Sequence, residues 1–166
     1  MSGPRAYANS AASVALRASK PIEKSYDDHA ILSMKFLLDT CVLSDFAKGD
    51  PRTRAHIGQA SPRDIGVSTI TEMEILYGLT LNPRMSDSLR RIMEEFFGLV
   101  QLLPFDSTAA RVTSELRASL KRRGAPIGAY DALIAGVALA HDLTLVTSNV
   151  REFERVDKLR VENWRR

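Results

Sequence analysis

Short apolar runs that end at helix-initiating residues recur along this chain, and this repeat constrains the fold more than any other feature. The runs expected to form strands are residues 35–38, 64–68, 99–103 and 143–147, with a last edge strand at 159–161. Helices are expected after Asp39, through Leu79, at 88–97, from an Asp106 or Ser107 cap to Gly124, and at 130–141. Strands that alternate with helices favour a mainly parallel sheet covered on both faces. The predicted fold class is therefore α/β with three layers.

Two of the expected helices differ in their apolar pattern. The helix before Gly124 is amphipathic, with an apolar stripe of Ala109, Val112, Leu116 and Leu120. Its cations Arg111, Arg117 and Lys121 lie away from that stripe. The helix at 130–141 is apolar on nearly every side, so we expect it to be sandwiched between other elements.

Composition places the chain among ordinary globular proteins. It has 166 residues, of which 45% are hydrophobic and 26% charged, which suits one domain with one core. The single cysteine, Cys41, forms no internal disulfide, and this favours a reducing cytoplasm. The longest apolar run, at 132–140, is far below the roughly 20 residues of a membrane span, so we expect a soluble protein without a membrane partner. The formal charge of +3 permits a nucleic-acid partner.

Residues 1–33 differ in character from the rest. They mix Ala, Ser, Arg and Lys, show no clean strand, and their one mildly apolar stretch is interrupted by Arg17, so no secretory signal is expected. The absence of acids before Glu23 faintly resembles a transit peptide. We interpret residues 1–33 as a disordered or non-native extension, and residues 34–166 as the folded domain.

Three acids stand where this architecture disfavours them. Asp39 follows an apolar strand, Glu74 interrupts an apolar helix, and Asp131 opens the most hydrophobic helix of the chain. A buried lone carboxylate is costly, and no lysine or arginine lies at helical spacing to pair with these acids. Each acid therefore needs a partner or a function.

The expected sheet brings these acids to one place. Ligands of open α/β sheets bind beyond the carboxyl ends of the strands, where Asp39 and Asn149 lie and where the helices carrying Glu74 and Asp131 begin. Two carboxylates about 4 Å apart repel by roughly 4 kcal/mol near a protein surface, and a cation relieves this repulsion. Oxygen ligands without sulfur or histidine select a hard ion, Mg²⁺ or Mn²⁺.

Each acid also has a structural alternative. Asp39 is equally suited to cap the helix that begins at Thr40. Glu74 is suited to a capping box with Thr71, although Thr69 and Glu72 form an equally good box. Asp131 is suited to complement the positive end of its helix.

Other residues are weaker candidates. Cys41 is expected to be a small buried hydrophobe rather than a nucleophile. Gly78, one turn after Glu74, is expected either to leave room for a ligand or to allow close packing. The basic stretch at 121–123 suits a solvated helix end, or a grip on phosphates close to Asp131. The three histidines, His29, His56 and His141, have no metal-binding spacing, and the chain has no CxxC motif for zinc.

A set of segments in register resembles one known family. These segments are residues 37–40, 68–78, 126–128 with 131–135, 143–149 with 152–153, and 162–164. In order and spacing they resemble the PIN domain and its VapC toxin branch over nearly all of residues 34–164. The resemblance implies a three-layer α/β/α domain that hydrolyses RNA phosphodiesters with Mg²⁺ or Mn²⁺.

The resemblance also implies roles for individual residues. Asp39, Glu74 and Asp131 match the metal-binding acids of the family, Asn149 stands where the family often has a fourth acid, and Thr147 is the hydroxyl residue before it. Asn149 removes one negative charge, which is expected to weaken a second metal without abolishing the first. Cys41 stands where the family frequently has Asn, so polar support from that side chain is expected to be absent.

The expected function is an endoribonuclease toxin with RNA as its substrate. The family further implies a VapB-like antitoxin as partner and a homodimer as the usual assembly. Two alternatives remain open. One is a noncatalytic RNA- or protein-binding PIN module. The other is a phosphatase with an aspartyl nucleophile, which resembles residues 39–40 but usually has a second Asp at the position of Cys41.

Overall fold

The computed structural model describes residues 34–82 and 86–165. The predictions for residues 1–33 lie outside this part of the chain. No helix in the described ranges combines the length and the apolar character that crossing a bilayer requires.

The centre of the described part is a parallel sheet. Its strands are β1 (Phe36–Leu38), β2 (Ile65–Ser68), β3 (Gln101–Leu103), β4 (Thr144–Val146) and β5 (Val161–Glu162). They lie in the order β3-β2-β1-β4-β5, and every neighbouring pair is parallel. The alternation of strands and helices in the sequence thus predicted the sheet correctly. The edge strand β5 begins two residues later than the expected 159–161.

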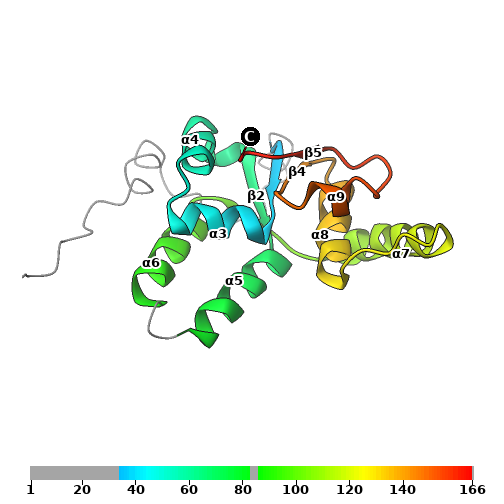
Figure 1. Cartoon of the computed structure of the whole chain (residues 1–166), viewed down its shortest axis with the longest axis horizontal. Coiled ribbons are helices and arrows are strands. Elements are labelled where there is room, and N and C mark those ends of the chain that lie inside the picture. The colour runs from blue at the N-terminus through cyan, green and yellow to red at the C-terminus, as the bar shows by residue number, and fades with distance from the viewer. Residues whose placement is uncertain (1–33, 83–85, 166) are drawn as a thin grey trace, which may run out of the picture.

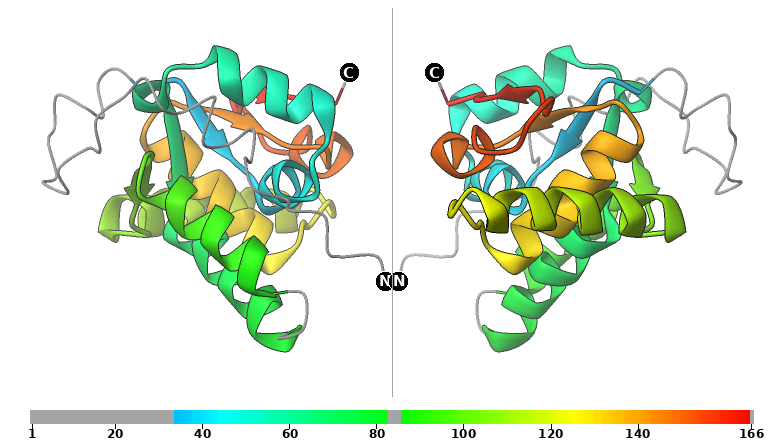
Figure 2. Two further views of the ribbon diagram at one scale, coloured as in Figure 1. Left: turned by 90° about the vertical axis from the view of Figure 1, so that its left-hand side faces the viewer. Right: turned by 90° about the vertical axis from the view of Figure 1, so that its right-hand side faces the viewer.

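Helices cover both faces of the sheet (Figure 1). One layer contains α3 (Thr40–Lys48), α4 (Pro51–Gln59), α5 (Thr69–Leu81) and α6 (Ser86–Phe97). The other contains α7 (Ser107–Arg122), α8 (Ala129–Ala140) and the short α9 (Val150–Phe153). Figure 2 shows α5 and α6 side by side, extending away from the rest of the molecule.

Alternation along the strands divides the apolar residues between two cores. Leu38 of β1 and Val146 of β4 pack with the α3–α6 layer, while their neighbours Leu37 and Leu145 pack with the α7–α9 layer. Successive side chains of a strand point to opposite faces of the sheet. A strand that is covered by helices on both faces must therefore be apolar at every position. This explains why the strand segments read as unbroken apolar runs.

The helix α4 was not expected from the sequence. Only Thr53 and Ile57 are buried along its nine residues, so its apolar pattern is too sparse to be recognised. Asp50 caps it by accepting a hydrogen bond from the Thr53 backbone N–H at 2.8 Å, and Pro51 occupies its first turn. These are sound initiation signals, but they are local and do not show what the helix packs on.

The interface of α7 with α8 differs in one residue from the predicted stripe. Ala109, Leu116 and Leu120 are buried as expected, but Thr113 is buried in place of Val112. A Cβ added at Gly136 of α8 would lie 1.8 Å from the Thr113 Oγ1 atom. The two helices therefore approach closely at a threonine and a glycine, and α8 is enclosed as its composition predicted.

Candidate active site

The sheet reverses its strand order at β1, and the polar side chains gather there. The chain proceeds from β1 to β2 and β3 on one side, whereas β4 and β5 lie on the other. Helices that leave neighbouring strands in opposite directions open a crevice at such a switch point. Asp39 follows β1 and Thr147 follows β4, and the Asp39 N–H donates to the Val146 carbonyl at 3.0 Å. The sequence placed Asp39 at this edge correctly.

Asp39 is only 5% exposed, and both of its carboxylate oxygens accept hydrogen bonds. Oδ1 accepts from the Thr40 backbone N–H at 2.7 Å, which caps α3 and confirms the capping alternative. Oδ2 accepts from the Thr147 hydroxyl at 2.6 Å and from the Cys41 thiol at 3.2 Å. Capping fixes one oxygen, while the other belongs to a polar cluster, so the two interpretations of Asp39 are compatible.

Glu74 reaches across from α5 to the start of α3. The Thr40 hydroxyl donates to the Glu74 Oε2 atom at 2.5 Å. Neither of the alternative capping boxes forms, because Ser68, one of the candidate caps, accepts from the Thr71 backbone N–H at 3.0 Å and caps α5. Local spacing did not show this, since the partner of Glu74 lies 34 residues away.

Asp131 lies in the first turn of α8, and the pKa of its carboxyl is raised to about 6. Burial is the largest cause, followed by the negative charges of Asp39, Glu152 and Glu74. The positive end of a helix lowers the pKa of a nearby carboxyl, so the upward shift shows that burial and repulsion outweigh the helix-end effect. A Cβ at Gly128 would lie 2.8 Å from Asp131 Oδ2, so the carboxylate turns back over a residue without a side chain.

The structure adds Glu152 of α9 to this acidic group. Glu152 belongs to a segment that resembles the family, but its sequence position predicted no role for it. Its charge acts on Asp131, and it also pairs with Arg155 at 3.5 Å. The available signal was its position three residues after Asn149, at the same strand end. We use the term acidic cluster for Asp39, Glu74, Asp131 and Glu152.

The two remaining predicted site residues, Thr147 and Asn149, differ in their burial and in their hydrogen bonds. Thr147 is fully buried, and its hydroxyl donates a hydrogen bond to Asp39. Asn149 is exposed, and its backbone N–H donates to the Thr147 hydroxyl oxygen at 3.0 Å. Its side-chain amide makes no hydrogen bond to any residue that the structure describes. A role for that amide in metal binding stays a prediction.

The expected lack of polar support at Cys41 is wrong. The thiol donates to Asp39, and its sulfur accepts from the Ser148 backbone N–H at 3.2 Å. Burial and then the charge of Asp39 raise the pKa of the Cys41 thiol, which keeps it protonated at neutral pH. Cys41 therefore connects Asp39 to the loop after β4, and it is not activated as a nucleophile.

The donor set suits a hard divalent cation in charge and in chemistry. Asp39, Glu74 and Asp131 form no ion pair with any lysine or arginine in residues 34–82 and 86–165. Their ligand atoms are oxygens, which Mg²⁺, Mn²⁺ and Ca²⁺ prefer. Within those same ranges, no three Asp, Glu, His or Cys side chains are close enough to form a ready-made coordination shell.

The weaker candidates lie outside the acidic cluster. Gly78 is exposed, and a Cβ there would meet no atom of the described residues within 4 Å, so Gly78 packs closely against none of them. Arg123 of the basic stretch pairs with Asp157 at 3.1 Å. His56 stacks on Trp164 with ring centroids 5.3 Å apart, and His141 follows the end of α8. His29 lies outside the described residues.

Comparison with known proteins agrees with this geometry. The family model described as "PIN domain" matches residues 36–159. A tRNA(fMet)-specific endonuclease VapC of Shigella flexneri is 37% identical over 79% of this chain and 98% of its own length. The toxin FitB of Neisseria gonorrhoeae is 31% identical over 77% of this chain and 97% of its own.

Solved structures give the same result. A DNA-bound VapBC complex of Salmonella typhimurium matches with a TM-score of 0.73 and 36% identity, covering 79% of this chain and 98% of that one. The expected three-layer α/β/α architecture is therefore confirmed. On its sequence, its strand order and the acids at its switch point, the chain belongs to the PIN domain family.

Proposed function

We propose that Asp39, Glu74 and Asp131 hold a divalent cation, Mg²⁺ or Mn²⁺, at the switch point of the sheet. The observation that carries this proposal is the meeting of these acids at one strand end, where Thr40 donates its backbone N–H to Asp39 and its hydroxyl to Glu74. The pKa of Asp131, raised to about 6 by burial and then by the charges of Asp39, Glu152 and Glu74, supports it. No lysine or arginine in the described part pairs with Asp39, Glu74 or Asp131. A divalent ion between these acids converts their repulsion into attraction.

The protein is an endoribonuclease and the toxin component of a VapBC-type toxin–antitoxin pair. Its curated relatives are named VapC endonucleases and ribonucleases, and the chain spans almost their whole length. Nucleases of this family depend on a divalent metal. A metal bound by carboxylates supplies a Lewis acid that lowers the pKa of a bound water and neutralises charge on a phosphate.

The residues around Asp39 prepare it for this task. Thr147 and Cys41 hold Oδ2 in place, and the Thr40 backbone N–H holds Oδ1, so the carboxylate does not rotate freely. Thr40 also positions Glu74 through its hydroxyl. These contacts support ligands through a second layer of hydrogen bonds, which orients them before the substrate arrives.

The substrate we propose is transfer RNA. The VapC enzymes of Shigella flexneri and Salmonella typhimurium carry tRNA(fMet) specificity in their names and are 37% and 36% identical to this chain. Sequencing of RNA 5′ ends after brief expression tests this substrate. Ends confined to ribosomal or messenger RNA would contradict it.

A VapB-like antitoxin is the proposed protein partner. The solved VapBC structures pair a VapC chain with its antitoxin, some of them on DNA. In this chain α5 exposes Met73, Tyr77 and Leu81, which lie four residues apart on one side of the helix. Exposed apolar side chains in a row mark a surface that a partner covers. Either the antitoxin or a second copy of the chain suits this surface.

The test of the catalytic proposal is Asp39→Asn. Asparagine keeps an oxygen for capping α3 but removes the charge, so the fold should persist while RNA cleavage with Mn²⁺ falls by about 100-fold or more. The matched control is Asp64→Asn. Asp64 pairs with Lys35 at the opposite, amino-terminal edge of the sheet, so its loss should leave cleavage unchanged.

Two outcomes would contradict this proposal. If Asp39→Asn cleaves RNA as fast as the wild type, the acidic cluster is not needed for cleavage. A wild-type protein that binds RNA in the presence of Mn²⁺ but never cleaves it would favour the noncatalytic PIN module. The phosphatase alternative is not supported, because Cys41 is a thiol that donates to Asp39.

A further inference from the structure

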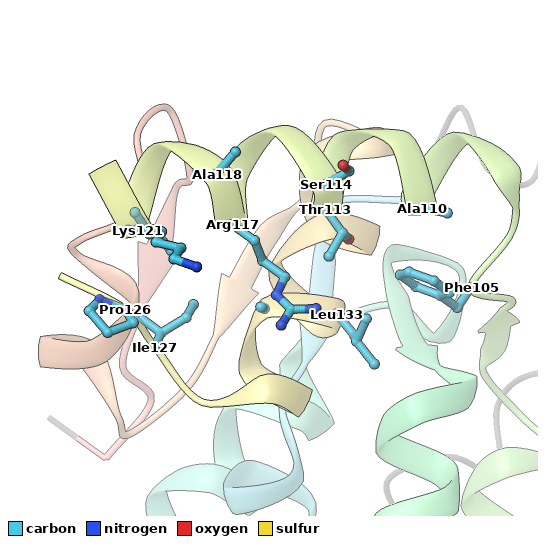
Figure 3. Close-up of a pocket in the computed structure, with 12 residues that line it drawn as sticks. Phe105, Ala110, Thr113, Ser114, Arg117, Ala118, Lys121, Pro126, Ile127 and Leu133 are labelled. Carbon is cyan, nitrogen blue, oxygen red and sulfur yellow. The ribbon is translucent and has the colours of Figure 1, made fainter. Parts of the chain in front are cut away.

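A groove separates α7 from the segment that leads into α8 (Figure 3). Its volume is about 690 Å³, which lies within the range of ligand pockets. Its lining includes two cations, Arg117 and Lys121, and three large apolar side chains, Phe105, Ile127 and Leu133. We call it the α7–α8 groove. Nothing in the acidic cluster lines it.

The two cations of the groove lack acidic partners. Arg117 and Lys121 lie four residues apart on one side of α7, and neither forms an ion pair with an acid of residues 34–82 or 86–165. In Figure 3 the Arg117 side chain reaches from α7 toward Leu133 of α8, across the groove. Like charges at this spacing repel, and an anion between them relieves the repulsion. A phosphate meets this need, and arginine is well suited to bind it.

The apolar side chains give the groove a second chemistry. Phe105 lies at one end and Leu133 beside Arg117, as Figure 3 shows. Aromatic and aliphatic side chains accept the flat face of a nucleobase, and stacking of this kind does not depend on base identity. An adjacent phosphate site and an apolar wall together match one nucleotide of a single strand.

The groove adjoins the acidic cluster in the fold. Ile127 precedes Gly128, over which the Asp131 carboxylate turns, and Leu133 follows Asp131 on the same helix. Phe105 follows β3 at the carboxyl edge of the sheet, where its N–H donates to Thr69 at the start of α5 at 3.3 Å. Asp131 and the groove residues Ile127, Ala132 and Leu133 thus belong to the start of α8 or the segment before it, so an RNA strand bound at the acidic cluster passes the start of α8 to enter the groove.

We propose that the α7–α8 groove binds one nucleotide of the RNA substrate beside the phosphate that is cleaved. Arg117 and Lys121 hold its phosphate, and Leu133 and Phe105 pack against its base. This inference rests on the proposed ribonuclease function. It concerns substrate binding, so its loss affects affinity rather than the chemical step.

The experiment compares two double variants of equal charge. Arg117→Ala with Lys121→Ala removes the groove cations, and Arg111→Ala with Arg122→Ala removes two exposed cations of the same helix that do not line the groove. All four side chains are exposed, so both proteins should fold, which circular dichroism checks. Steady-state cleavage of total tRNA with Mn²⁺ gives kcat and KM for each protein.

Binding is measured separately from cleavage. The probe is a fluorescein-labelled single-stranded RNA of 12 nucleotides, titrated in EDTA at several salt concentrations. We expect the groove variant to raise KM and the Kd of the probe by about tenfold with kcat nearly unchanged, since two charge-assisted contacts are lost. The slope of log Kd against log salt should fall by roughly 1.4, at about 0.7 for each single-strand phosphate contact. The control variant should change each quantity less than threefold.

The possible outcomes distinguish failure of the groove proposal from failure of the proposed ribonuclease function. If the wild type cleaves tRNA and the two double variants behave alike, the groove does not bind substrate, and the ribonuclease assignment stands. If the groove variant lowers kcat with KM unchanged, the groove acts on the chemical step and the inference is wrong. If the wild type cleaves no RNA, both proposals fail together.

Discussion

Asp131 carries the clearest chemical signal at the scale of single residues. An acid whose pKa is raised in the folded state binds a proton more tightly there than in the unfolded chain. Its ionisation therefore destabilises the fold as pH rises from the unfolded value near 3.8 to about 6. Burial is the largest cause of this cost, and the repulsion from Asp39, Glu152 and Glu74 is the part that a bound cation would relieve.

The first prediction follows from this linkage. Without metal, the free energy of unfolding contributed by Asp131 should decrease between pH 4 and pH 6, and Asp131→Asn should remove that decrease and make the protein more stable at pH 7. Urea denaturation in EDTA at intervals of half a pH unit measures the difference between the two proteins. Parallel stability curves across this range would show that Asp131 titrates normally.

A second prediction concerns Cys41. Cys41→Ala removes one donor to Asp39 and the acceptor of the Ser148 N–H, so it should lower stability by about 1 kcal/mol and reduce cleavage several-fold. Cys41→Ser restores a donor and an acceptor in a smaller side chain and should recover most of the activity. Denaturant titration and cleavage rates test the pair. Full activity of the alanine variant would mean that Thr147 alone positions Asp39.

At the scale of elements, the contact between α7 and α8 controls where Asp131 lies. Gly136 of α8 lies against Thr113 of α7, and a Cβ at Gly136 would collide with the threonine. The Thr113 Oγ1 atom is buried and has no hydrogen-bond partner in the part of the chain that the structure describes. The contact therefore allows α8 to approach α7 closely.

The third prediction tests this contact. Gly136→Ala should destabilise the protein by about 1–3 kcal/mol through overpacking, and Thr113→Ala in the same chain should restore part of the loss. The matched control is Gly78→Ala on the exposed side of α5, where the added methyl meets nothing within 4 Å. That variant should gain roughly 0.5–1 kcal/mol, because alanine favours a helix over glycine.

Urea denaturation gives all three values. Equal effects of alanine at Gly136 and at Gly78 would show that α7 and α8 do not pack as closely as the structure has them. A Gly78→Ala variant that is stable but cleaves RNA poorly would instead favour the interpretation that Gly78 leaves room for a ligand.

At the scale of the whole molecule, the acidic cluster joins segments that are distant in sequence. Asp39 follows β1, Glu74 lies on α5, Asp131 on α8 and Glu152 on α9. The termini of the described part are also tied together, since Trp164 packs against Phe36 with ring centroids 5.3 Å apart. Folding must therefore be nearly complete before the acids meet, and a cation held by Asp39, Glu74 and Asp131 stabilises the entire fold.

The fourth prediction uses this dependence. Mn²⁺ at about 100 times its Kd should stabilise the protein by about 2.7 kcal/mol, which raises Tm by roughly 5–10 °C for a domain of this size. Asp39→Asn should lose most of the shift, whereas Asp64→Asn should retain it. Differential scanning calorimetry with and without Mn²⁺ measures it. An equal shift in all three proteins would indicate that the metal binds elsewhere.

Much of the fold was predictable because its signals are local. Apolar runs gave the central strands, Asp106 and Ser68 are recognisable caps, and α8 is too apolar to lie on a surface. The helix α4 was missed because only two of its residues are buried. Thr113 was missed because a hydroxyl residue facing a glycine departs from the apolar stripe that marks a helix interior.

For the candidate site, the sequence by itself determined which acids are unusual and at which edge of the sheet they lie. Alternating strands and helices bring every strand end to the same side, whatever the details of packing. Only the tertiary structure decided that Thr40 binds Glu74, that Cys41 supports Asp39, and that Glu152 joins the acidic cluster. The physical reason is that a pKa and a hydrogen bond depend on distances of a few ångströms between segments, and sequence spacing does not determine those distances.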